Sequence, residues 1–207
     1  MRPSYGALVT VRAAASVWRR YTVPCAGTVA AFVAAIAAFP GAGAAEVGYV
    51  SSSAKLGQVA ACERADDPGT SLAVQQRAIT CLVNAARRQA GRPLLATPPK
   101  LRRAAAIKGH RVVSCGQFSH TPCGAAATAA IRAAGYRYAW FGENLFAGTW
   151  GEFTPRQVVE SWLGSPGHRA NILRPSFRVF GASRVLAQDI FGEAQTAVWV
   201  ATFASPR

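Results

Sequence analysis

Four cysteines that follow an N-terminal leader most constrain what this 207-residue chain can fold into. Residues 1–44 hold four arginines and no acid, and their uncharged second half ends in the small residues Ala42, Gly43 and Ala44. This is the layout of a secretory signal cleaved after Ala44. An uncleaved membrane anchor is the alternative, because the apolar run is about long enough to span a bilayer.

Outside the leader, an even number of cysteines remains: Cys62, Cys81, Cys115 and Cys123. An exported chain with such a set is expected to form disulfides. Of the three possible pairings, loop closure favours the local ones, which join Cys62 to Cys81 and Cys115 to Cys123. A zinc site built from these thiols is the alternative, but none of the spacings is the two-residue kind found in structural zinc sites.

The chain is strongly basic, with 23 lysines and arginines against 9 aspartates and glutamates. Without the leader the numbers are still 19 and 9, which favours anionic surroundings. The arginines are scattered singly or in pairs without a recognition motif, so we do not expect nucleic acid as a partner. An envelope lipid, a sterol-like molecule or an anionic polymer fits better, although a solvated basic surface explains the same charge without any partner.

The pattern of apolar residues divides the remainder into a linker or approach segment over 45–70 and one domain over 71–207. Helical spacing begins at Ser71 and stops at Gly91. We expect Thr97 to cap a second helix, an alanine-rich helix to end at Gly135, and a fourth to begin with a capping box at Thr154. Strands are predicted over 138–146, 178–186 and 196–203. About four helices covering a small antiparallel sheet give an α+β fold.

Three residues stand where site chemistry is plausible. His120 ends the run Phe118, Ser119, His120 between two cysteines, so a disulfide there would fix its imidazole. Glu143 follows two aromatic residues, and a carboxylate in such surroundings needs a partner. His168 lies in the first turn of a helix that Ser165 caps, where the helix dipole favours a neutral ring. We interpret His110 as a surface residue and the tryptophans Trp140, Trp150, Trp162 and Trp199 as core packing.

Several short motifs together resemble one known family. They are FSH at 118–120, AAGY at 133–136, GEN at 142–144 and SWLGSPGHRANIL at 161–173. The chain is similar over residues 72–204 to the bacterial branch of the CAP superfamily, the cysteine-rich secretory, antigen-five and pathogenesis-related (SCP-like) proteins. The resemblance implies an α-β-α sandwich with a cleft whose two histidines and two acids can hold a divalent metal.

On this resemblance His120, Glu143 and His168 take three of the four metal positions. The fourth is held here by Ser165 instead of an acid, and Glu160 lies on another part of the helix turn. Two histidines and one carboxylate can still bind zinc with water in the fourth place. We therefore expect an extracellular or cell-envelope ligand-binding module first and a zinc-dependent hydrolase second. The third alternative is a structural cell-surface domain with a vestigial cleft.

Overall fold

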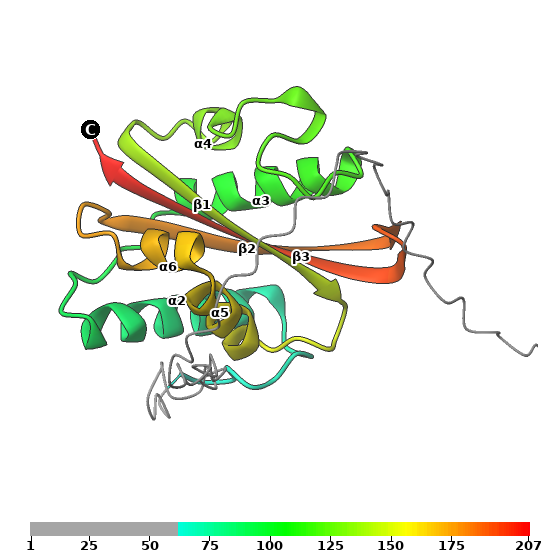
Figure 1. Cartoon of the computed structure of the whole chain (residues 1–207), viewed down its shortest axis with the longest axis horizontal. Helices are drawn as coiled ribbons and strands as arrows, with labels where there is room; N and C mark the ends of the chain where they lie inside the picture. Colours follow the sequence, from blue (N-terminus) through cyan, green and yellow to red (C-terminus); the bar gives the residue numbers. More distant parts are fainter. Residues whose placement is uncertain (1–61) are drawn as a thin grey trace, which may run out of the picture. The chain divides into compact units, whose positions relative to one another are not determined.

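The computed structural model describes residues 62–207, so the predicted leader and most of the predicted linker lie outside the described residues. The described part contains five α-helices, one short 3-10 helix and three strands (Figure 1). In chain order these are α2 (Leu72–Gln89), α3 (Pro99–Ser114), η1 (Pro122–Gly124), α4 (Ala129–Ala133), β1 (Tyr138–Thr149), α5 (Pro155–Gly164), α6 (Pro166–Leu173), β2 (Val179–Ile190) and β3 (Glu193–Pro206). The predicted α+β fold is confirmed.

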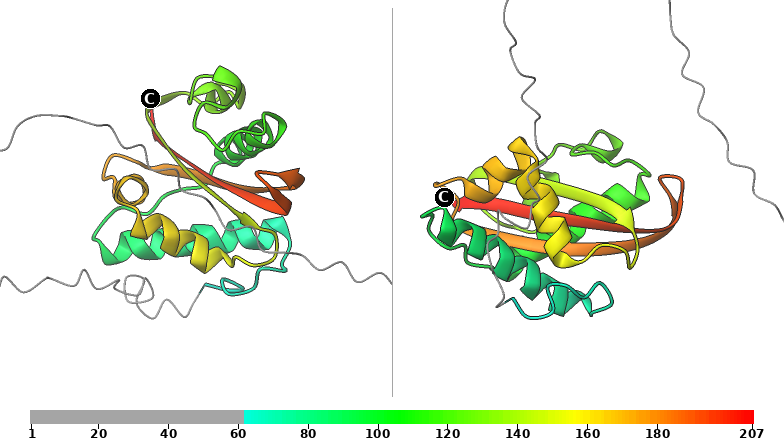
Figure 2. Two further views of the ribbon diagram at one scale, coloured as in Figure 1. Left: turned by 45° about the vertical axis from the view of Figure 1, so that its right-hand side comes forward. Right: turned by 60° about the horizontal axis from the view of Figure 1, so that its bottom comes forward.

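An antiparallel sheet with the strand order β1-β3-β2 forms the middle layer. Helices α3 and α4 cover one face, and α2, α5 and α6 cover the other (Figure 2). Glu143 pairs with Thr202, and Thr202 pairs with Gly181, so these residues form one row across the three strands. Paired residues point to the same face of a sheet, and alternate residues point to opposite faces. This row faces α3, whereas the row of Gly142, Phe203 and Phe180 faces α2, α5 and α6.

The strands extend further than the sequence pattern predicts. β2 and β3 continue until Ile190 pairs with Glu193, which leaves only Phe191 and Gly192 in the turn. Both residues have positive φ, 58° and 81°, as a two-residue hairpin turn with the right twist requires. The predicted strands, the first ending at Leu186 and the next beginning at Thr196, are therefore too short, because polar residues near the tip of a hairpin look like a loop in the sequence.

Helix starts follow local chemistry, with one correction. At α5 the predicted capping box is confirmed: the Thr154 hydroxyl accepts from the Gln157 N–H at 3.2 Å, and the Gln157 side chain accepts from the Thr154 N–H at 2.9 Å. The predicted cap at Thr97 is wrong. Pro98 is extended, with ψ at 145°, so the helix begins only at Pro99. The Thr97 carbonyl instead accepts a hydrogen bond from Arg102.

The core is only partly built from the tryptophans. Trp162 and Trp199 are buried as predicted, but Trp140 and Trp150 are 58% and 42% exposed, so the prediction of core packing is wrong for these two. Trp140 stands beside the irregular start of β1, where the register shifts, and the Arg174 guanidinium lies 5.3 Å from its ring centre. Trp150 directly follows Thr149, the last residue of β1.

Two disulfides confirm the predicted local pairing, Cys62 with Cys81 and Cys115 with Cys123. The first ties the segment before α2 to that helix. Cys62 and Ala65 in this segment are buried in the main hydrophobic cluster. Residues 62–70, placed by the sequence pattern in the linker, therefore pack against the domain.

Candidate functional site

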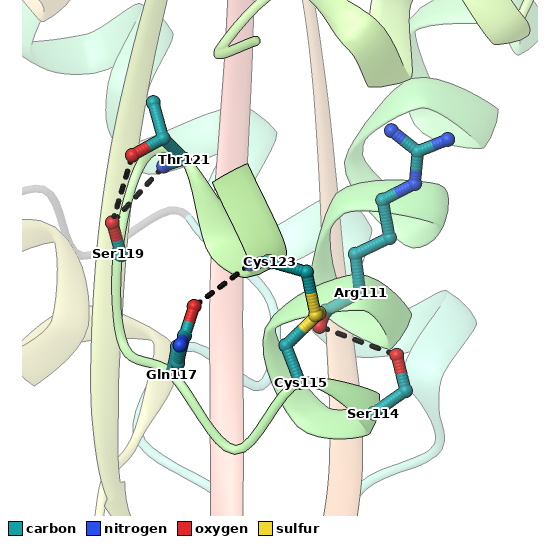
Figure 3. The surroundings of a disulfide bond; sticks show 7 residues. All are labelled: Arg111, Ser114, Cys115, Gln117, Ser119, Thr121 and Cys123. Atoms are coloured by element: carbon teal, nitrogen blue, oxygen red, sulfur yellow. Dashed lines mark hydrogen bonds between the residues drawn. A yellow bond between two sulfur atoms is a disulfide. The ribbon is translucent and has the colours of Figure 1, made fainter. Parts of the chain in front are cut away.

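His120 is positioned by the disulfide loop between α3 and η1. Figure 3 shows Cys115 at the end of α3 bonded to Cys123, with Gln117, Ser119 and Thr121 along the same loop. The Gln117 side chain accepts from the Cys123 N–H at 2.7 Å, and the Ser119 hydroxyl accepts from the Thr121 N–H at 3.0 Å. Closed by a covalent bond and these hydrogen bonds, the loop presents a His120 side chain that is 52% exposed.

Glu143 lies in β1, with its side chain only 2% exposed on the α3 face of the sheet. A Cβ added to the preceding Gly142 would lie 2.8 Å from the Asn171 and Phe177 side chains, so only glycine fits between β1 and the segment around α6. The Asn171 amide donates to the Glu143 carbonyl at 3.1 Å and to the Asn144 side-chain oxygen at 2.9 Å. The GEN sequence therefore combines a close approach, a buried acid and an amide that fixes α6.

The structure brings His120 and Glu143 together, and it adds a residue that the sequence reasoning missed. His120 Nδ1 lies 2.8 Å from Glu143 Oε1, and Lys108 Nζ lies 2.9 Å from the same oxygen. The Lys108 side chain is 3% exposed. The sequence contains a hint of this role, because Lys108 has the same helical spacing as the apolar residues Leu101, Ala105 and Val112, which form the buried face of α3. A charged residue at that position predicts a buried partner.

His168 lies in the first turn of α6, and its backbone carbonyl accepts from the Asn144 side-chain amide at 3.0 Å. Burial lowers the pKa of the His168 imidazole, and the neighbouring His120 lowers it further. The predicted preference for a neutral ring is thus supported, although burial is the main cause. His110 is exposed on α3, as expected for a surface residue.

The donor set that the resemblance implies for a divalent metal is altered in two places, at Glu143 and at Ser165. Within residues 62–207, no three or more His, Cys, Asp or Glu side chains group together in a way that holds an ion. Glu143, the acid among the predicted ligands, already contacts a lysine ammonium. Ser165 caps α6 at the position where the resemblance implies a second acid, and Glu160 is buried in α5. Zinc ligation by His120, Glu143 and His168 stays a prediction.

A second feature is a groove of about 560 Å³ along α2 and the chain that leads into α3. Its basic side chains are Arg77, Arg88 and Arg102, and its apolar ones include Ala73 and Leu94. Leu94 is 49% exposed there. The sequence reasoning missed this groove because arginines spaced along a helix look the same as a solvated face.

Comparison with known proteins gives the family of this chain. The profile of the cysteine-rich secretory protein (CAP) family matches residues 80–203, so the chain belongs to this family. The uncharacterized protein YkwD of Bacillus subtilis is 29% identical over 123 residues, which are 59% of this chain and 47% of YkwD. The chain thus spans about half the length of this curated relative.

Two solved structures share the fold. An extracellular protein containing a SCP domain from Bacillus anthracis superposes with a TM-score of 0.55 at 21% identity, over 65% of this chain and 41% of that protein. An outer surface protein from Borrelia burgdorferi gives a TM-score of 0.56 at 17% identity, over 64% of this chain and 93% of the other. At these identities the likeness concerns the fold alone.

Proposed function

We propose that this CAP domain is an exported binding module for an anionic lipid of the cell envelope. The observation that carries the proposal is a charge asymmetry: residues 68–142 contain eleven lysines and arginines and no aspartate or glutamate. This stretch forms α2, α3 and α4. A surface with one sign of charge attracts ligands of the opposite sign.

Two of the eleven cations have internal roles, because Arg87 and Lys108 are buried. The other nine are exposed or half-buried and available to a ligand: Arg77, Arg88, Arg92, Lys100, Arg102, Arg103, Arg111, Arg132 and Arg137. The stretch itself holds no carboxylate, and Glu63, which precedes it, lines a hollow together with Arg77. These exposed cations lie on both sides of the sheet, on α2 and on α3 and α4, and three of them, Arg77, Arg88 and Arg102, line one groove.

The groove along α2 indicates what kind of anion fits. Arg77 and Arg88 lie eleven residues apart on one side of α2, about 16 Å along the helix. Apolar side chains such as Leu94 line the space near them. An acidic headgroup matches the arginines, and an acyl chain matches the apolar surface. A sterol-like ligand lacks the charge, and a polymer such as a polyphosphate has no use for the apolar part.

An exported location supports an envelope ligand. Both disulfides join cysteines of the described domain, and such bonds persist in oxidising compartments. Within residues 62–207, every helix is too short or too polar to cross a bilayer. A domain of this kind would meet lipids at a membrane surface or as single extracted molecules.

The test is co-sedimentation with phosphatidylcholine vesicles that contain or lack phosphatidylglycerol. We expect binding only to the anionic vesicles. The variant Arg77→Gln/Arg88→Gln should bind about 30-fold more weakly, because each arginine near an anionic surface contributes about 1 kcal/mol. The matched control, Arg169→Gln/Arg207→Gln, removes two exposed arginines outside the groove and should change binding much less. Equal losses in both variants would contradict a groove site, and binding to dextran sulfate alone would favour a polymer ligand.

A hydrolase is the second candidate, supported by the contact between Glu143 and His120. An ionised carboxylate only accepts, so the 2.8 Å hydrogen bond places the proton of a neutral His120 ring on Nδ1 and leaves Nε2 as a proton acceptor. A histidine oriented in this way can act as a general base without metal. Ester or peptide hydrolysis that survives a chelator and is lost in His120→Ala, but not in His110→Ala, would establish it. The absence of turnover on libraries of esters and peptides would count against a hydrolase.

A further inference from the structure

A lysine is buried where α3 meets the sheet. A Cβ added to Gly181 would lie 2.2 Å from the Leu101 backbone, and one added to Gly109 would lie 2.7 Å from the Val185 side chain. These two glycines therefore let α3 lie directly on β2. Lys108 immediately precedes Gly109, so its side chain starts at this close contact and has no direct path to solvent, with 3% of it exposed.

The sheet register brings an acid into reach of that lysine. Gly181, Thr202 and Glu143 form one row on the α3 face, and this row crosses roughly 10 Å from β2 to β1. Gly181 contributes no side chain to the row. The four-carbon stem of Lys108 extends along the sheet until its Nζ lies 2.9 Å from Glu143 Oε1.

The ammonium joins two parts of the candidate site. Besides the Glu143 carboxylate, Lys108 Nζ donates to the backbone carbonyl of His120. The His120 ring in turn contacts the same Glu143 oxygen at 2.8 Å. His120 is thus fixed twice by this unit, through its main chain by Lys108 and through its side chain by Glu143.

We propose that Lys108 is the built-in cation of this centre and that Glu143 consequently does not serve as a metal ligand. The Glu143 side chain is 2% exposed. A divalent ion bound to its carboxylate would either displace the Lys108 ammonium or share the carboxylate with the ammonium at close range. Sharing is repulsive, because charges in a water-poor interior are weakly screened. Displacement leaves a buried ammonium without its counter-charge.

Lys108 therefore has a positioning role. Its charge balances the Glu143 carboxylate, the carboxylate holds the Nδ1 proton of His120, and the half-exposed ring presents Nε2 as an acceptor. The centre is therefore a positioned imidazole beside a carboxylate whose charge Lys108, and not a metal ion, balances. This centre is separate from the groove on α2, which other residues line.

The first test is zinc calorimetry at neutral pH on the oxidised protein and two lysine variants. The wild type should show no stoichiometric zinc binding that depends on Glu143. Lys108→Gln removes the ammonium and should gain stoichiometric zinc binding that the wild type lacks, and adding Glu143→Gln should abolish the gain. Lys100→Gln, an exposed lysine in the first turn of the same helix, should behave as the wild type.

Stoichiometric zinc binding by the wild type that disappears in Glu143→Gln would overturn the proposal, and so would a folded Lys108→Gln without any gain. A measurement on the wild type alone covers the case in which the variant does not fold. In ¹⁵N spectra of the imidazoles, His120 should be protonated at Nδ1 and should keep its shifts when equimolar zinc is added. Saturable shifts of His120 and His168 together would refute the assignment.

Discussion

Removal of the Lys108 ammonium should destabilise the domain strongly. In Lys108→Met the Glu143 carboxylate, 2% exposed, loses its cation and keeps only the His120 ring. Loss of one partner of a buried ion pair costs about 3–5 kcal/mol, because the remaining charge is uncompensated. For a domain of this size each kcal/mol lowers the melting temperature by about 2–4 °C, so we expect a fall of roughly 6–20 °C. Urea titration of the oxidised protein, followed by tryptophan fluorescence, measures the free energy of unfolding.

The double variant Lys108→Met/Glu143→Gln separates the charge effect from packing. With both charges gone, the loss should be clearly smaller than the sum of the two single losses. Lys100→Met, which changes an exposed lysine of the same helix, should stay within about 0.5 kcal/mol of the wild type. A Lys108→Met variant within about 1 kcal/mol of the wild type, the cost of an exposed pair, or strictly additive losses would refute the reasoning.

Three further outcomes follow from single features. Arg87 is buried and donates to the carbonyls of Pro93, Ile172, Arg174 and Phe177, and burial lowers its pKa to about 10. Arg87→Leu should lower the free energy of unfolding, measured by urea titration, by about 3 kcal/mol or more, because several buried acceptors lose their donor. The variant Cys115→Ser/Cys123→Ser opens a loop with a sequence separation of 8 and should cost about 2.5 kcal/mol in thermal unfolding, with faster hydrogen exchange around His120. The pKa of His168 is lowered in the folded state from its ordinary value of 6.5, so the unfolded chain takes up the proton first as the pH falls. Stability should therefore decrease as the pH falls through that value. His168→Asn should show a weaker decrease when urea titrations above and below that pH are compared.

Local sequence chemistry predicted the elements that depend on neighbours in the chain. The capping box at Thr154 and the paired cysteines are short-range features, and the structure confirms both. The prediction of a cap at Thr97 is wrong because threonine is a good cap by residue type, whereas the two prolines after it delay the start of the helix. The prediction of burial for Trp140 is wrong because an aromatic residue in a strand suggests core packing, whereas this one lies beside a register shift and is exposed.

The candidate site was only half predictable, because one of its contacts depends on tertiary packing and not on neighbours in the chain. His120 and Glu143 are recognisable from their motifs, and they do meet. Lys108 is far from Glu143 in the sequence and reaches it only because Gly109 and Gly181 bring α3 onto the sheet. Such a contact depends on packing between a helix and a strand that carry no common motif. The buried stripe of α3 shows that Lys108 needs a partner but does not identify the partner.

The most direct test of the proposed function is to locate the ligand on the folded domain. We would titrate the ¹⁵N-labelled, oxidised protein with a short-chain phosphatidylglycerol below its micelle concentration and follow the backbone amides by NMR. Binding at the groove predicts saturable shifts concentrated in α2 and in the residues around Leu94 and Arg102, with His120 and His168 unchanged. Saturable shifts confined to His120, Glu143 and His168, or no shifts at all, would contradict it.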